Sequence, residues 1–142
     1  MVVLLDVNVL IALFDPDHAM SDHVAIWFTQ TAPSGWATCA ITENGFVRIM
    51  SQQTYPHPVQ PHIALTTLKK ARTHPSHQFW NCDISVTDTD WIDPLHVLHS
   101  SHVTDVYLLG LAVKHNGCFV TLDQRIARTS VKGATQANLL VL

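Results

Sequence analysis

Short apolar runs alternate with helical patterns along the chain, and this alternation restricts the fold more than any other feature of the sequence. The run Val2–Leu5 is rich in β-branched residues, as in strands that are buried on both faces. Further strands are expected at Trp36–Cys39, Phe79–Ser85, Cys118–Leu122 and Leu139–Leu142. Because strands separated by helices pair in parallel, the sequence predicts a three-layer α/β/α fold with a parallel central sheet.

Helices are expected between these strands, where apolar residues recur at helical spacing after a capping residue. Asn8 is expected to cap the first helix, and Asn116-Gly117 to end the helix that opens at Thr104 or Asp105 with a left-handed residue. The other expected helical segments are Val9–Phe14, Ser21–Thr29, Ile41–Met50, Pro61–Arg72, Asp88–Leu98 and Asp123–Thr129.

Length and composition set limits on the kind of protein. A chain of 142 residues fits one domain, residues 1–142, with an ordinary apolar core. Because 47% of the residues are hydrophobic and only 13% are charged, we expect an apolar surface that a protein partner or a second copy covers. The apolar helix faces that suit such a surface, and suit the core equally well, are Ile11–Phe14, Val24–Phe28 and Val47–Met50.

Three cysteines without a CxxC motif support neither a disulfide framework nor a zinc knuckle. The apolar run before Asp6 is too short for a secretory signal or a membrane span, so we expect a cytoplasmic protein without membrane contact. The net charge of −3 argues against a strongly basic nucleic-acid-binding surface and leaves room for a local basic patch.

Acidic residues stand where the predicted strands end and helices begin. Asp6 and Asp123 follow strands, and Glu43 and Asp105 lie in the first turns of helices. Carboxyl ends of parallel strands share one edge of the sheet, so these carboxylates are expected to converge there. A like-charge pair at 4 Å costs about 4 kcal/mol at an effective dielectric constant of 20, so such a site needs cations or captured protons. Ligation by oxygen alone favours Mg²⁺ or Mn²⁺.

Each of these residues taken alone also has an ordinary structural explanation. Asp105 suits a helix N-terminus, Asp6 and Asp123 suit turns, and Asn8 and Thr121 suit a cap and a strand. The joint arrangement, rather than any one residue, favours a metal site.

The segments LLDVNVLIAL, ITENGFVRIM and HVTDVYLLGLAVKHNGCFVTLD resemble the signature blocks of PIN-domain ribonucleases, in particular VapC-type toxins of toxin–antitoxin pairs. The resemblance runs from Leu4 to about Ile126 with the blocks in family order, and HQFWNCDIS resembles the third-strand region. The pattern VTDxYLLxLA, followed by the aspartate of TLD, is its most specific part.

The resemblance implies an acidic metal site made of Asp6, Glu43, Asp105 and Asp123, with Asn8 and Thr121 as supporting polar groups. It implies one or two Mg²⁺ ions, with Mn²⁺ as a substitute, that bind the scissile phosphate of RNA and activate a water molecule. It also implies an endoribonuclease toxin that leaves a 3′-hydroxyl and a 5′-phosphate, a VapB-type antitoxin that blocks the site, and a homodimer. Every one of the acidic positions matches the family pattern.

Two other functions compete with the nuclease. A receiver-type phosphoacceptor domain is also a small parallel α/β fold, but it needs an acidic pair after the first strand and a Lys near the last one. Here Val7 follows Asp6, and no Lys closes the final strand, LLVL. The other competitor is a catalytically silent PIN-fold module that binds or represses within an antitoxin complex.

Other polar and aromatic residues have two interpretations each. His96, His99 and His102 recur every third residue, which suggests either a zinc site or ordinary surface histidines. Trp27, Trp36, Trp80 and Trp91 suit base stacking or core packing. Basic side chains either hold RNA phosphates or are solvated charges; they are Arg48, Lys69, Lys70, Arg72, Arg125, Arg128 and Lys132.

Overall fold

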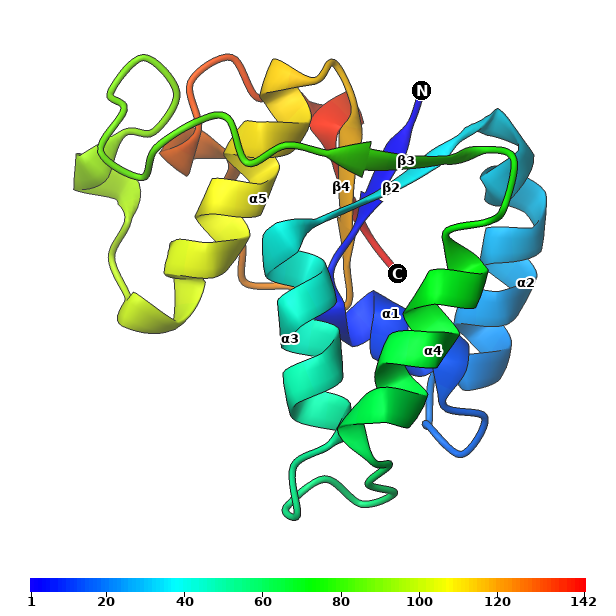
Figure 1. Cartoon of the computed structure of the whole chain (residues 1–142). Coiled ribbons are helices and arrows are strands. Elements are labelled where there is room, and N and C mark those ends of the chain that lie inside the picture. Colours follow the sequence, from blue (N-terminus) through cyan, green and yellow to red (C-terminus); the bar gives the residue numbers. More distant parts are fainter.

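A computed structural model of residues 1–142 has a central sheet of five parallel strands in the order β3-β2-β1-β4-β5 (Figure 1). The strands are β1 (Val3–Leu5), β2 (Trp36–Cys39), β3 (His77–Trp80), β4 (Cys118–Thr121) and β5 (Leu139–Val141). All four pairings between neighbours are parallel. Helices pack on both faces of the sheet, so the predicted three-layer α/β/α fold is confirmed.

The strand register sorts apolar side chains onto the two faces. Val3 pairs with Trp36 and Cys118, and all three side chains join one core. Leu4 pairs with Ala37 and Phe119, which contribute to the core on the opposite face. Because successive strand residues point to opposite faces, both sides of the central strands are buried. This explains why the strands are continuous apolar runs.

Four helices cover one face of the sheet, and Figure 1 shows them gathered together. They are α1 (Val7–Phe14), α2 (Ser21–Thr31), α3 (Ala40–Met50) and α4 (Pro61–Ala71). Helix α1 begins at Val7, so Asp6 and not the expected Asn8 is its N-cap. The Asp6 carboxylate accepts a hydrogen bond from the Val7 backbone N–H, which frees the Asn8 side chain for other contacts.

Helix α5 (Val103–Lys114) covers the other face, together with the segments on either side of the helix in the sequence. Every residue from Val106 to Ala112 is buried, because the sheet lies on one side of the helix and these segments lie on the other. A helix enclosed in this way is apolar all round. None of the helices is both long enough and apolar enough to cross a membrane.

Helix α5 ends as expected at Asn116-Gly117, and the two residues have different roles. Asn116 takes the left-handed conformation, with φ of 53°. Gly117 is needed for close approach, because a Cβ atom there would lie 2.7 Å from the backbone oxygen of Val2 and 2.4 Å from the Trp80 ring. The chain therefore turns tightly from α5 into β4.

Three expected elements differ in the structure. The strand expected at Phe79–Ser85 is β3, which begins earlier and ends at Trp80. The helix expected at Asp88–Leu98 is wrong, since only the short 3-10 helix Pro94–His96 forms. The helix expected at Asp123–Thr129 is also wrong, since only the 3-10 helix Arg128–Ser130 forms. The remaining 3-10 helices are Ala32–Ser34, Ser100–His102 and Gln136–Asn138.

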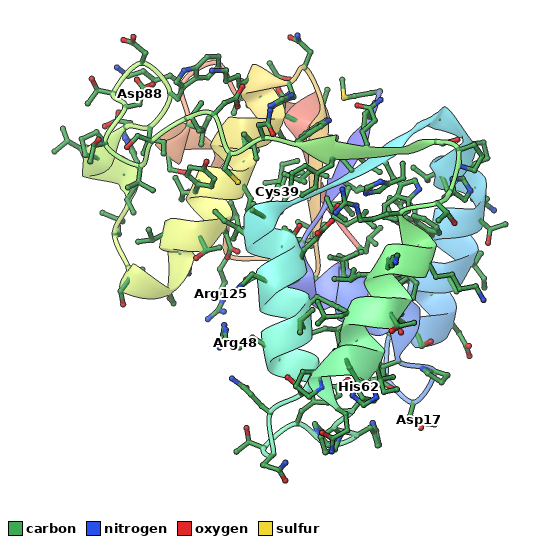
Figure 2. The ribbon with its side chains drawn as sticks, viewed as in Figure 1. Asp17, Cys39, Arg48, His62, Asp88 and Arg125 are labelled. Atoms are coloured by element: carbon green, nitrogen blue, oxygen red, sulfur yellow. The ribbon has the colours of Figure 1, made fainter.

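Aspartate side chains account for both missing helices. Asp88 Oδ1 accepts a hydrogen bond from the Asp90 N–H at 3.0 Å, and Asp123 Oδ1 accepts one from the Arg125 N–H at 2.9 Å. Such local bonds satisfy backbone donors in turns and so compete with helix formation. In Figure 2 Asp88 accordingly lies on an irregular loop.

Candidate active site

The carboxyl ends of the central strands open into a cavity of about 660 Å³ between α3 and α5. The residues that line it include Asp6, Asn8, Asp105 and Asp123. Arg48 of α3 also lines the cavity, and Figure 2 shows Arg48 and Arg125 extending into the space between α3 and α5. The parallel strands β1 and β4 end side by side here, which brings Asp6 and Asp123 to the same edge.

Asp6 is buried, and hydrogen bonds hold both of its oxygen atoms. Oδ1 accepts from the Val7 N–H at 2.7 Å, and Oδ2 accepts from Thr121 Oγ1 at 2.7 Å. Thr121 is fully buried and also accepts from the Asp123 N–H at 3.0 Å. Asn8 Oδ1 accepts from the Leu122 N–H at 3.3 Å. The supporting pair Asn8 and Thr121 therefore joins the ends of β1 and β4.

Burial, together with neighbouring negative charge, raises the pKa of two of these carboxyl groups. The pKa of Asp105 rises to about 7, because the group is partly buried and because Asp6 and Asp123 are close. Burial also raises the pKa of Asp6, although the hydrogen bonds from Thr121 and Val7 oppose the effect. A cation bound between carboxylates that repel one another stabilises their ionised forms. A donor set made only of oxygen atoms fits Mg²⁺ or Mn²⁺.

Asp123 differs because it has its own counter-ion. Arg125 donates from Nε to Oδ1 at 3.0 Å and from Nη2 to Oδ2 at 2.8 Å. These bonds and the neighbouring positive charge lower the pKa of Asp123 to about 2. Asp123 therefore stays ionised at neutral pH, while Asp105 titrates.

Glu43 lies in the first turn of α3 but turns its carboxylate away from these residues. Oε1 accepts from Thr38 Oγ1 at 2.7 Å, and Oε2 accepts from Arg72 Nη1 at 3.3 Å. Glu43 thereby lines an adjoining cavity, which shares Ala40 and Asn44 with the first one. The structure thus brings three of the predicted carboxylates to one cavity and places the fourth in the next.

The position of Glu43 depends on a partly buried chain of hydrogen bonds that the sequence analysis did not identify. The Thr38 hydroxyl donates its only hydrogen to Glu43, so His77 Nε2, 2.8 Å from the same oxygen, must donate its own N–H. Burial, with Arg72 and His74, lowers the pKa of His77 to about 4 and keeps the ring neutral at pH 7. A polar Thr38 inside the apolar run WATC was the available signal.

A second cluster of side chains of the kinds that bind metal ions lies at the end of α1. Ligand atoms of Asp15, Asp17 and His57 all lie within 4.8 Å of one another, and no other three His, Cys, Asp or Glu residues are as close. Asp15 is buried, and it already accepts hydrogen bonds from Tyr55, from His57 and from the Asp17 N–H. The carboxylates in the first cavity stand further apart than this group.

The histidines and tryptophans of the two alternatives make ordinary structural contacts. His96 pairs with Asp93 at 3.0 Å, His99 packs edge-on against His102, and the ligand atoms of the three histidines do not all lie within 4.8 Å of one another. Trp36 and Trp80 are buried in the two cores. Trp27 and Trp91 are partly buried against those cores.

Known proteins resemble the chain over nearly its whole length. It is 48% identical over 139 residues to Ribonuclease VapC44 of Mycobacterium tuberculosis, a match that covers 98% of both chains. It is 37% identical over 137 residues to Ribonuclease VapC39 of the same organism, covering 96% of this chain and 99% of the relative. No protein-family model matches the chain.

A solved structure shares the fold. It is the crystal structure of VapBC2 from Rickettsia felis bound to a DNA fragment from their promoter, and the TM-score is 0.59 at 12% identity. The match covers 88% of this chain and 90% of the other. The fold and the full-length relatives together show that the chain belongs to the VapC ribonuclease family.

Proposed function

We propose that the protein is a Mg²⁺-dependent endoribonuclease, the toxin of a type II toxin–antitoxin pair. The observation that carries the proposal is the convergence of Asp6, Asp105 and Asp123 on one cavity, where burial and the two neighbouring negative charges raise the pKa of Asp105. Such a site favours a divalent cation over three bare carboxylates. The relatives named as ribonucleases supply the reaction class, which is hydrolysis of RNA phosphodiester bonds.

The proposed metal ligands are Asp6, Asp105, Asp123 and Glu43, with Mn²⁺ as a substitute for Mg²⁺. When bound, the metal would neutralise the acidic centre and supply Lewis-acid chemistry for phosphodiester hydrolysis. Thr121 and Asn8 hold the ends of β1 and β4 together, so Asp6 is oriented before the substrate arrives. Asp105 would release its proton as the cation binds.

Cationic side chains beside the acids would receive the RNA backbone. Arg48 lines the same cavity as the acids, and Arg125 is paired with Asp123 at the rim. Phosphate groups are bound by guanidinium groups in a planar, bidentate manner. We propose that these two residues hold the phosphates that flank the scissile bond.

Glu43 enters the proposed set through the family pattern ITENGF, while its carboxylate is bound to Arg72 and Thr38 in the structure. To act as a ligand it must exchange these partners for the cation. Because Glu43 has a long, unbranched side chain, we propose that it makes this exchange by a change of rotamer.

The VapBC2 complex supports a small VapB-type antitoxin as the protein partner. A homodimer and a cytoplasmic location, where RNA is available as substrate, complete the proposal. Membership of the VapC family removes the receiver-type alternative.

The proposal is tested by incubating total cellular RNA with the purified wild-type protein and its Asp105→Asn variant, with Mg²⁺ or with EDTA, and mapping the new ends. We expect discrete cuts with 5′-phosphates, lost in the variant and in EDTA. If folded, antitoxin-free wild-type protein cuts nothing that the variant spares, the silent binding module becomes the better account. Light scattering tests the dimer, and a monomer at micromolar concentration would contradict it.

A further inference from the structure

The adjoining cavity on the other side of α3 has a volume of about 640 Å³ and a chemical character different from that of the acidic one. Its wall contains Lys69 and Arg72 from the end of α4, and Phe79 from the edge strand β3. Glu43 is the only acidic residue in that wall. The cavity therefore combines an excess of positive charge with an aromatic ring.

Arg72 and Phe79 form one stacked unit. The guanidinium carbon of Arg72 lies over the Phe79 ring, 4.7 Å from its centroid. The Phe79 residue is 41% exposed, which is unusual for so large an apolar side chain, because β3 is an edge strand that the core covers incompletely. Aromatic rings and guanidinium planes are the two surfaces on which proteins stack unpaired nucleobases.

Lys69 adds a free cation beside this unit. It takes part in none of the ion pairs of the structure, whereas Arg72 is paired with Glu43 at 3.3 Å. An unpaired ammonium group in a cavity wall is suited to a phosphate, which it binds as a point charge.

The two cavities adjoin at the start of α3, where Ala40 and Asn44 line both of them. A strand whose scissile phosphate occupies the acidic cavity can therefore continue directly into the basic one. An RNA strand suits both cavities, because its phosphates can pair with the Lys69 ammonium group and its bases can stack on the Arg72–Phe79 unit.

We propose that this second cavity is a nucleotide subsite, which binds one unpaired nucleotide of RNA next to the scissile phosphate. The base stacks on the Arg72–Phe79 unit, and Lys69 binds the phosphate. This inference rests on the proposed function, and it names single-stranded RNA as the substrate class.

The test measures binding of a fluorescein-labelled single-stranded RNA oligonucleotide by anisotropy, with Mg²⁺, in the full-length protein; each variant also carries Asp105→Asn, so that the RNA stays intact, and the reference is Asp105→Asn with all other residues as in wild type. Phe79→Ala is expected to weaken binding about tenfold, as loss of one stacked base does, whereas Phe79→Tyr keeps the affinity of the reference. Lys69→Ala is expected to weaken binding and to lower the salt dependence by about one phosphate contact. The matched control is Lys132→Ala: Lys132 lines neither cavity, is exposed and lies next to Val131 of the core on the opposite face of the sheet, which favours the solvated-charge interpretation for this residue.

Cleavage assays on the same substitutions, with Asp105 intact, separate this inference from the proposed function. RNA affinity that depends on Phe79 and Lys69 supports the subsite even where no variant cuts RNA, in which case only the nuclease proposal fails. The subsite is overturned if Phe79→Ala and Lys69→Ala retain the affinity of the reference and the wild-type KM while cleavage depends on Asp105, or if the reference protein binds no single-stranded RNA. Unchanged RNA affinity together with weakened antitoxin binding would instead assign the cavity to a protein partner, and would also overturn the subsite.

Discussion

Thr121 Oγ1 donates a 2.7 Å hydrogen bond to Asp6 Oδ2, and this bond joins the end of β4 to the end of β1. The register that pairs Leu5 with Val120 places the two residues opposite each other. Because Thr121 also accepts from the Asp123 N–H, one buried hydroxyl orients two of the proposed ligands. The sheet therefore prepares the site before any ligand is present.

Replacement of Thr121 by the isosteric Val tests this role. Thr121→Val leaves Asp6 Oδ2 and the Asp123 N–H without their partner, so we expect a loss of about 1 to 3 kcal/mol in the free energy of unfolding and weaker Mg²⁺ binding. Chemical denaturation and magnesium titration measure the two effects. Thr121→Ser keeps the hydroxyl and should retain Mg²⁺ affinity; a similar Mg²⁺ affinity in Thr121→Val would show that the hydroxyl does not orient the site.

Asp105→Asn should stabilise the metal-free protein while it abolishes cleavage. The folded pKa of Asp105 is raised to about 7 from 3.8, so the stability that its protonated form provides is complete below pH 4 and is lost as the pH rises through 7. An asparagine at position 105 does not ionise, so the variant keeps this stability at high pH. Because the group is half-exposed, solvent screening limits the expected gain at pH 8 to about 1 to 2 kcal/mol.

Thermal unfolding in EDTA at pH 5 and pH 8 checks the effect of Asp105→Asn, whose gain should be larger at pH 8. Asp22→Asn is the matched control, because Asp22 also lies in the first turn of a helix but outside the site. It should cost a few tenths of a kcal/mol at either pH through the helix dipole. A metal-free Asp105→Asn variant that is less stable than wild type at pH 8 would contradict the repulsion described here.

The convergence of Asp6, Asn8, Asp105 and Asp123 was predictable because it follows from backbone topology alone: parallel strands end at one edge. The direction of Glu43 was not predictable. It depends on Thr38 and Arg72, which belong to β2 and to the end of α4, and no local pattern specifies that contact.

The two segments expected to be helical failed for a different reason. Asp88 and Asp123 are compatible with a helix N-terminus and with a turn, and the sequence alone does not decide between them. In the structure, hydrogen bonds from the backbone N–H groups of Asp90 and Arg125 to these two carboxylates stabilise the turn. At Asp123 the turn also brings Arg125 to the carboxylate.

The turn from α5 into β4 provides a test of packing. Gly117→Ala would place a Cβ atom 2.7 Å from the Val2 backbone oxygen, which cannot move without disturbing β1, so we expect a loss of about 3 kcal/mol or more. Asn116→Gly is the control, because glycine accepts the φ of 53° without strain and should change stability by less than about 1 kcal/mol. Equal stability of Gly117→Ala and wild type in urea denaturation would show that the contact relaxes freely.

The last prediction concerns the buried carboxylate at the end of α1. Burial would raise the pKa of Asp15, but hydrogen bonds from Tyr55, the Asp17 N–H and His57 outweigh it and lower the pKa. A lowered carboxyl pKa stabilises the fold above the unfolded pKa, near 4, and this stability is lost as the pH falls through the folded pKa. Tyr55→Phe removes the main donor, so we expect a loss of about 1 to 3 kcal/mol at pH 7 that shrinks in acid.

Tyr107→Phe provides a matched control for Tyr55→Phe, because the Tyr107 hydroxyl donates to the backbone oxygen of Ile84, which does not titrate. Its cost should be the same at about pH 3 and at pH 7, whereas the cost of Tyr55→Phe should be smaller at about pH 3, below the unfolded pKa of Asp15. Urea denaturation of wild type and both variants at each pH measures the comparison. A pH-independent cost for Tyr55→Phe would mean that the Tyr55 hydroxyl does not set the ionisation of Asp15, and that the loop before α4 is held to α1 by packing alone.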